Sequence, residues 1–117
     1  MARKPGKHPI TLYQNADFIE RFIWKDSNGN AINNTGYSAA MQFKEKLDSD
    51  ANFLSLSSGT EITLGGSNGV IDILVDQTVL EAITARSGYY DLVMTSGSGT
   101  PYKILYGPVT IDKGVVR

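Results

Sequence analysis

The feature that most constrains this chain is an alternation of apolar and polar side chains every two residues, in short runs separated by turn residues. The run 37–43 shows it most plainly, because Tyr37, Ala39, Met41 and Phe43 alternate with small or polar residues. Successive side chains of a strand point to opposite faces, so this spacing predicts a half-buried strand with those four side chains in the core. The same spacing predicts three further core rows, which are Ile71, Ile73 and Val75; Tyr90, Leu92 and Met94; and Leu105, Val109 and Ile111.

Other short runs complete the expected set of strands. They cover residues 8–15, 17–24, 51–59 and 60–66. The run 17–24 is partly apolar on both faces, with Arg21 in one row and Glu20 in the other. Alternation alone therefore leaves open which of its two rows faces the core.

Glycine and asparagine separate these runs, at 28–29, 65–66, 68–69 and 97–99. Asn-Gly tolerates positive φ, so we expect a hairpin turn at 28–29 between the strand 17–24 and the strand that begins at Tyr37. One segment has helical spacing, from Asp76 as N-cap to a stop at Gly88, and it is short enough to be a crossover. About eight short strands with one short helix predict an all-β fold, an antiparallel β-sandwich.

Length and composition limit the possible classes of protein. The 117 residues suit a single domain, which we divide into a basic N-terminal arm (1–8), a β-sandwich (9–112) and a short C-terminal tail (113–117). The net charge of −1 and the lack of a long apolar run predict no nucleic-acid partner and no membrane insertion. We also expect no signal peptide at the N-terminus, and the absence of cysteine excludes disulfides and thiolate metal sites.

The loop after Trp24 contains a D-x-N-x-N pattern, which also opens calcium-binding loops. Asp26, Asn28 and Asn30 would supply the first ligands, but Ala31 stands where such loops need glycine and Tyr37 where they need a bidentate glutamate. A plain turn is therefore the favoured interpretation. We expect no metal site and no cofactor.

No arrangement of residues typical of catalysis is evident. His8 is the single histidine and lies in the basic arm, and the chain lacks a G-x-S-x-G motif and a phosphate-binding loop. The acidic pairs in loops and strand ends are typical of solvated faces and helix caps. We therefore expect a protein that is not an enzyme.

Two groups of residues are candidates for binding a partner. Arg3, Lys4 and Lys7 crowd the arm without an acidic neighbour, which suits docking to an acidic partner. Tyr102 and Tyr106 lie on rows that the alternation does not assign to the core, as do two other tyrosines, Tyr13 and Tyr89. Exposed tyrosines bind sugar rings or protein partners, although cross-strand packing explains them equally well.

Residues 16–46, 59–83 and 88–112 together resemble a group of small tailed-phage virion proteins. The shared pattern is an F-x-x-x-x-x-W-K-D strand and turn from Phe18, an N-T-G-Y entry into the next strand, a G-x-I-x-I strand, a short helix and a Y-D-L strand that ends in a glycine-rich hairpin. The pattern is similar to that of the N-terminal domain of phage baseplate upper proteins. This resemblance implies an immunoglobulin-like β-sandwich.

The resemblance also implies a role. Domains of this group anchor a component to the virion, and longer members carry a receptor-binding part that we do not expect in a chain ending at Arg117. The expected function is that of a structural subunit of the tail, baseplate or neck, made in the bacterial cytoplasm and oligomeric in its assembly. Its expected partners are other virion proteins and copies of itself. A carbohydrate-binding host-attachment module and a capsid decoration protein are the alternatives.

Overall fold

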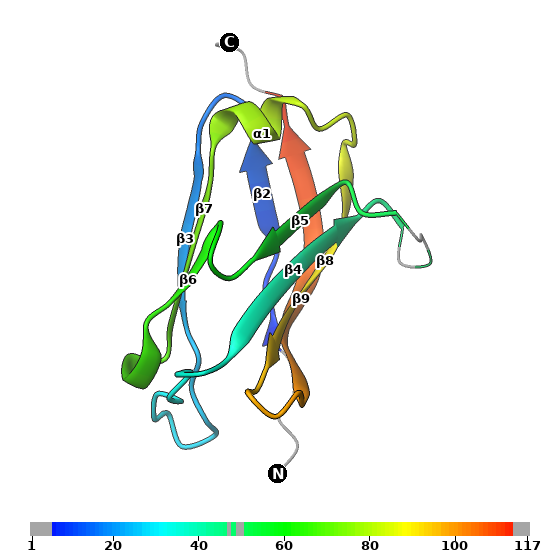
Figure 1. The fold of residues 1–117 in the computed structure, drawn as a ribbon. Helices are drawn as coiled ribbons and strands as arrows, with labels where there is room; N and C mark the ends of the chain where they lie inside the picture. The colour runs from blue at the N-terminus through cyan, green and yellow to red at the C-terminus, as the bar shows by residue number, and fades with distance from the viewer. Residues whose placement is uncertain (1–5, 47, 49–50, 114–117) are drawn as a thin grey trace.

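A computed structural model describes residues 6–46, 48 and 51–113 (Figure 1). Nine strands, one α-helix and one 3-10 turn occur in this part of the chain. They are β1 (Gly6–Lys7), β2 (Ile10–Tyr13), β3 (Phe18–Ile23), β4 (Ser38–Lys44), β5 (Leu54–Ser57), β6 (Ile62–Leu64), η1 (Gly66–Asn68), β7 (Val70–Val75), α1 (Gln77–Glu81), β8 (Ser87–Thr95) and β9 (Pro101–Asp112).

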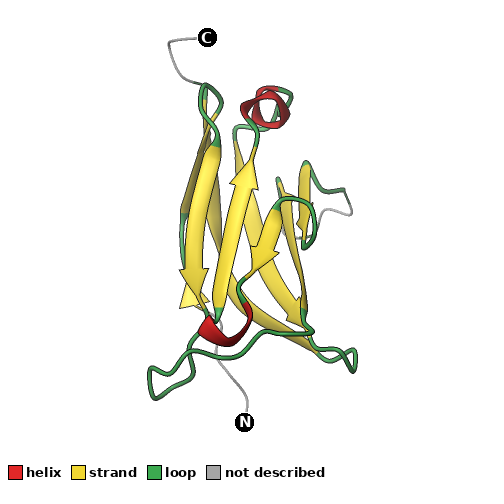
Figure 2. Ribbon diagram, turned by 60° about the vertical axis from the view of Figure 1, so that its left-hand side comes forward, coloured by secondary structure: helices red, strands yellow, loops and turns green. Residues whose placement is uncertain are grey.

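The strands form two sheets that face each other, with α1 at one end (Figures 1 and 2). One sheet has the order β3-β7-β6, and the other has the order β1-β9-β8-β4-β5, with β2 also paired to β9. This is an immunoglobulin-like arrangement, in which β6, β7 and β3 take the places of strands D, E and B, and β4, β8 and β9 take those of strands C, F and G. Every pairing between named strands is antiparallel except those of β1 and β2, which run parallel to β9. The predicted all-β sandwich is confirmed.

The core lies between the two sheets and contains the predicted rows. From those rows Ala39, Met41, Phe43, Ile71, Ile73, Val75, Tyr90, Leu92, Met94, Val109 and Ile111 are buried, and Tyr37 and Leu105 pack against them half-buried. The open question of 17–24 is also settled. Phe22 and Trp24 face inward, whereas Ile19, Arg21 and Ile23 are exposed.

The turn at 28–29 forms and closes a short hairpin in which Lys25 pairs with Ala31, but it does not join β3 to β4, because these strands belong to different sheets. The Asp26 carboxylate accepts the backbone N–H groups of Asn28 and Asn30, and Gly29 adopts a φ of 85°. The chain then crosses from one sheet to the other. A local turn signal reports a reversal of direction, and it carries no information on whether the flanking strands become neighbours.

The helix is shorter than predicted: it ends at Glu81 and not at Gly88. Asp76 is the N-cap as expected. The Gln14 side chain, buried and distant in sequence, donates to the carbonyls of Leu80 and Ile83 at 2.6 and 2.8 Å. It thereby adds a second hydrogen bond to the Leu80 carbonyl, which also accepts the Ile83 N–H, and provides one for the Ile83 carbonyl just beyond the end of α1.

A β-bulge in β9 corrects the prediction for Tyr102. Leu92 pairs with Leu105 but Val93 pairs with Lys103, so one extra residue of β9 lies between these pairs. The extra residue shifts the alternation, as bulges do. Tyr102 therefore turns inward, half-buried against the core, while Tyr106 stays on the outer face.

Candidate interaction surfaces

The outer face of the six-stranded sheet carries an exposed aromatic surface that we call the tyrosine patch, made of Tyr89, Tyr106, Lys103, Asp91 and Lys7. These side chains line a depression of about 400 Å³ together with their neighbours on β8 and β9. Tyr89 and Tyr106 are 44% and 36% exposed. The patch therefore offers two aromatic rings and three charges to a partner.

The strand register explains why these residues meet. Asp91 on β8 lies opposite Tyr106 on β9, and Tyr106 lies opposite Lys7 on β1. The Lys103 ammonium is 3.2 Å from the Asp91 carboxylate and 5.1 Å from the centre of the Tyr106 ring. An ion pair and a cation–π contact thus hold Lys103 against the tyrosine.

The predicted binding residues divide into three groups in the structure. Lys7 and Tyr106 are brought together on adjacent strands, as parts of the same patch. Tyr102 is separated from them, because its ring lies 6.1 Å from Trp24 and 6.4 Å from Tyr37 on the core side of the sheet. Arg3 and Lys4 lie outside the described residues.

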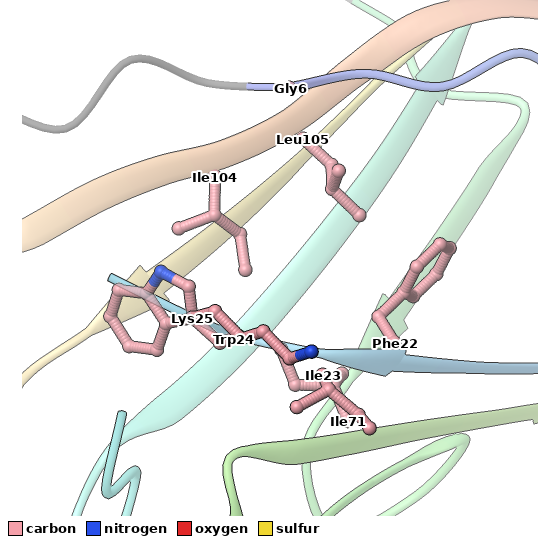
Figure 3. Close-up of a pocket in the computed structure, with 8 residues that line it drawn as sticks. All are labelled: Gly6, Phe22, Ile23, Trp24, Lys25, Ile71, Ile104 and Leu105. Atoms are coloured by element: carbon pink, nitrogen blue, oxygen red, sulfur yellow. The ribbon is translucent and has the colours of Figure 1, made fainter. Parts of the chain in front are cut away.

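A second, apolar depression opens between the two sheets, where β1 and β9 face the end of β3 (Figure 3). This inter-sheet groove has a volume of about 300 Å³. Figure 3 shows Ile104 and Leu105 projecting from β9 toward Phe22 and Trp24. Among the described residues that line it, Lys25 is the only charged one and none is suited to acid–base chemistry, so this part of the groove suits an apolar side chain.

His8 has a structural role that the sequence did not reveal. Its Nε2 atom lies 3.2 Å from the Glu20 carboxylate, and its ring meets the edge of Phe22 at 5.1 Å between centroids. Its backbone carbonyl accepts the hydroxyl of the buried Tyr90 at 2.6 Å. Burial raises the pKa of Tyr90 above its ordinary value, and the negative charges of Glu20 and Asp91 add to this effect.

The described residues contain no group of three or more His, Cys, Asp or Glu side chains that could hold a metal ion. The Asp26 carboxylate, the first residue of the D-x-N-x-N pattern, is engaged with the backbone of its own turn. In the same part of the chain, no helix is long and apolar enough to cross a membrane. The features that the structure does offer are surfaces for contact.

Comparison with known proteins assigns the chain to a family. The family described as "LtfC-like, beta-sandwich domain" matches residues 4–112. The chain belongs to the LtfC-like β-sandwich family. This family name is associated with bacteriophages, which supports a phage β-sandwich domain.

This LtfC-like domain is also similar to solved structures. One of them is described as "Structure-based site-directed photo-crosslinking analyses of multimeric cell-adhesive interactions of VGSC beta subunits". Its sequence is 10% identical to this chain, the TM-score is 0.50, and the match covers 90% of this chain and 91% of that chain. Another, of Drosophila OTK extracellular domains 3-5, is 11% identical with a TM-score of 0.34, covering 93% of this chain and 33% of that chain. No curated protein matches the chain. At 10% identity the first likeness shows the shared sandwich fold and nothing of the role.

Proposed function

We propose that this LtfC-like domain is a non-enzymatic structural protein of a tailed-phage virion, an adaptor or accessory subunit of the tail, baseplate or neck. Membership of a phage-associated family across residues 4–112 supports this role. The resemblance of residues 16–112 to the N-terminal domain of baseplate upper proteins supports the same location. The mechanism is assembly, in which the rigid sandwich presents fixed surfaces to neighbouring virion proteins.

The observation that carries this proposal is the tyrosine patch, which lies on the outer face of a sheet whose inner face contributes to the core. Tyrosine brings a large contact area at a small cost in side-chain entropy, and it is enriched among residues that dominate binding energy at protein interfaces. The Asp91–Lys103 pair beside Tyr106 supplies the polar rim that such interfaces carry. The sheet beneath holds these groups in one geometry, which favours a permanent contact.

The test is incorporation into particles. Phage lacking the chain would be propagated in cells that supply wild type, Tyr106→Ala, Lys7→Ala or the deletion of residues 1–8, and purified particles would be quantified by mass spectrometry. Thr110→Ala is the matched control, because Thr110 is exposed on the same strand but outside the patch. We expect wild type and the control to be incorporated equally and Tyr106→Ala to be reduced at least about fivefold, consistent with loss of a contact of about 1 kcal/mol or more.

Absence of the wild-type chain from purified particles would refute the virion role. Full incorporation of the variant that lacks residues 1–8 would refute a contribution from Arg3, Lys4 and Lys7, and it would leave the virion role itself standing. Electron cryo-microscopy of the particle would then place the subunit in the tail, baseplate or neck, or on the capsid, where a decoration protein would lie.

A carbohydrate-binding role is the second candidate, and the depression of about 400 Å³ between the two tyrosines favours it. Aromatic rings stack on the apolar faces of sugars, and Lys103 and Asp91 would supply hydrogen bonds to hydroxyl groups. Glycan-array binding by wild type, lost in both Tyr89→Ala and Tyr106→Ala and kept in Thr110→Ala, would support this role. Absence of binding by the wild-type protein would exclude it for the glycans tested.

A further inference from the structure

The outer face of the three-stranded sheet holds the most exposed aliphatic side chains among the described residues. Ile19, Leu74 and Ile23 are 71%, 56% and 49% exposed. Together with the ion pair of Arg21 and Asp72 they form a surface that we call the aliphatic face. It lies on the opposite side of the sandwich from the tyrosine patch, because the two surfaces are the outer faces of different sheets.

The strand register arranges the aliphatic face in three rows. Ile19 lies opposite Leu74 and Arg21 lies opposite Asp72, and Ile23 follows beside Val70. A charged row is therefore flanked by an apolar row on each side. Outward positions of a solvated sheet are ordinarily polar, so exposed aliphatic side chains on both sides of an ion pair make this face a candidate contact site.

The ion pair in the middle row is well formed. Arg21 donates from Nε to Asp72 Oδ1 at 2.6 Å and from Nη2 to Asp72 Oδ2 at 3.0 Å. The hydrogen bond to Arg21 lowers the pKa of Asp72, and the same contact raises that of Arg21. Both charges are consequently present near neutral pH, at fixed positions on adjacent strands.

This charge pattern identifies the partner that fits. A two-fold axis parallel to the strands, between β3 and β7, would place Arg21 of one copy over Asp72 of the other, and the reverse. The same rotation would lay Ile19 over Leu74 in the flanking row. A two-fold axis across the strands would instead place arginine over arginine, so the pattern selects a single orientation. Two-fold contacts require a self-complementary surface of this kind.

We propose that the aliphatic face binds a second copy of this chain, with the two three-stranded sheets stacked face to face. The proposal deepens the assembly role proposed above by naming its self-contact. The stacked sheets would lie about 10 Å apart, as in the core of a sandwich. The four charges would alternate in sign across the contact, enclosed by the apolar rows.

The dimensions of the sheet set the expected strength. Strands of six residues such as β3 and β7 extend about 20 Å, and the two strands that this axis superposes span about 10 Å, so the contact covers roughly 200 Å² on each copy. Stable specific complexes bury about 800 Å² on each partner, so the isolated pair would be weak, with a dissociation constant of about 1 mM. An assembly that holds many copies in register raises their effective concentration and makes such a contact sufficient.

The experiment is sedimentation equilibrium of the full chain at concentrations up to about 1 mM. Wild type is compared with Arg21→Asp, Asp72→Arg and an equimolar mixture of these two variants. Either variant alone presents two like charges on each copy, so we expect its self-association constant to fall at least about tenfold. In the mixture opposite charges face each other between copies, although neither chain can form its own ion pair. We expect the mixture to associate at least as strongly as wild type.

Leu74→Lys is expected to weaken self-association, and its matched control is Tyr13→Lys, since Tyr13 is 52% exposed but lies on β2 in the other sheet. Melting curves of each variant would show that it is folded. The proposal is overturned if wild type remains monomeric throughout, if the mixture is no heavier than its components, or if the control weakens association as much as Leu74→Lys. Because incorporation into particles is measured separately, a monomeric chain found in virions would reject the self-contact and leave the virion role standing.

Discussion

Replacement of Asn34 by alanine should destabilise the domain more than any exposed asparagine of the same loop. Asn34 is 1% exposed. Its Oδ1 atom accepts the backbone N–H of Gly66 at 2.7 Å, and its Nδ2 atom donates to the carbonyl of Val70 at 3.1 Å. One side chain thus connects the loop that crosses between the sheets to the turn between β6 and β7.

The expected magnitude follows from the two bonds. A hydrogen bond contributes about 0.5–1.5 kcal/mol net, so Asn34→Ala should lower the free energy of unfolding by about 1–3 kcal/mol. For 117 residues the entropy of unfolding is about 0.25 kcal/mol/K, so Tm should fall by about 4–12 °C. Differential scanning calorimetry at pH 7 measures this shift, and urea unfolding gives the free energy independently.

The neighbouring Asn33 is the matched control. It is exposed, and its Oδ1 atom accepts only the local backbone N–H of Thr35 at 2.9 Å. Asn33→Ala should shift Tm by no more than about 2 °C, which corresponds to about 0.5 kcal/mol. Equal shifts for the two variants would refute the argument that Asn34 joins the two loops.

Three further predictions concern other contacts. Tyr90→Phe removes the hydrogen bond to the His8 carbonyl and should lower Tm by about 2–6 °C at pH 7. The pKa of Tyr90 is raised in the folded protein, so above about pH 10 the tyrosine ionises in the unfolded chain first and wild type loses stability. Because Tyr90→Phe lacks this group, it should lose less stability than wild type in that pH range. Gly88→Ala should prevent folding or lower Tm severely, because its Cβ would clash with the backbone carbonyl oxygen of Lys44, and soluble expression with calorimetry would show this. Asp76→Ala should lower Tm at pH 7, because backbone and side-chain hydrogen bonds from the first turn of α1 lower the pKa of that carboxylate. The difference from wild type should shrink as the pH falls from about 4 through the lowered pKa of Asp76, and a difference unchanged at pH 2 would contradict this.

Much of the fold was predictable because its signals are local. The rows of β4, β7 and β8 were predicted correctly from alternation, and Asp76 was recognised as a cap from its place before a helical run. The turns at Gly29 and Gly99 were likewise expected, and both glycines adopt positive φ. In each case a few neighbouring residues determine the outcome.

The candidate site was predictable only in part. Lys7 and Tyr106 were expected to be available for contact, and both are exposed, but their meeting depends on β1 running parallel to β9. Tyr102 was placed on the wrong face, because a single extra residue in β9 reverses the alternation and no residue type marks that position in the sequence. The aliphatic face was missed because both rows of β3 are partly apolar, and the packing of Phe22 and Trp24 decides between them.

The sequence by itself determined which segments are strands, where most of the chain reverses and which side chains form most of the core. Hydrophobic period and turn chemistry act within a few residues, so they can be recognised without a structure. Only the tertiary structure decided that β3 and β4 lie in different sheets, that Asn34 and not Asn33 is buried, and that Arg21 meets Asp72. These outcomes depend on contacts between residues distant in the chain, whose energies are realised only once both sheets have formed.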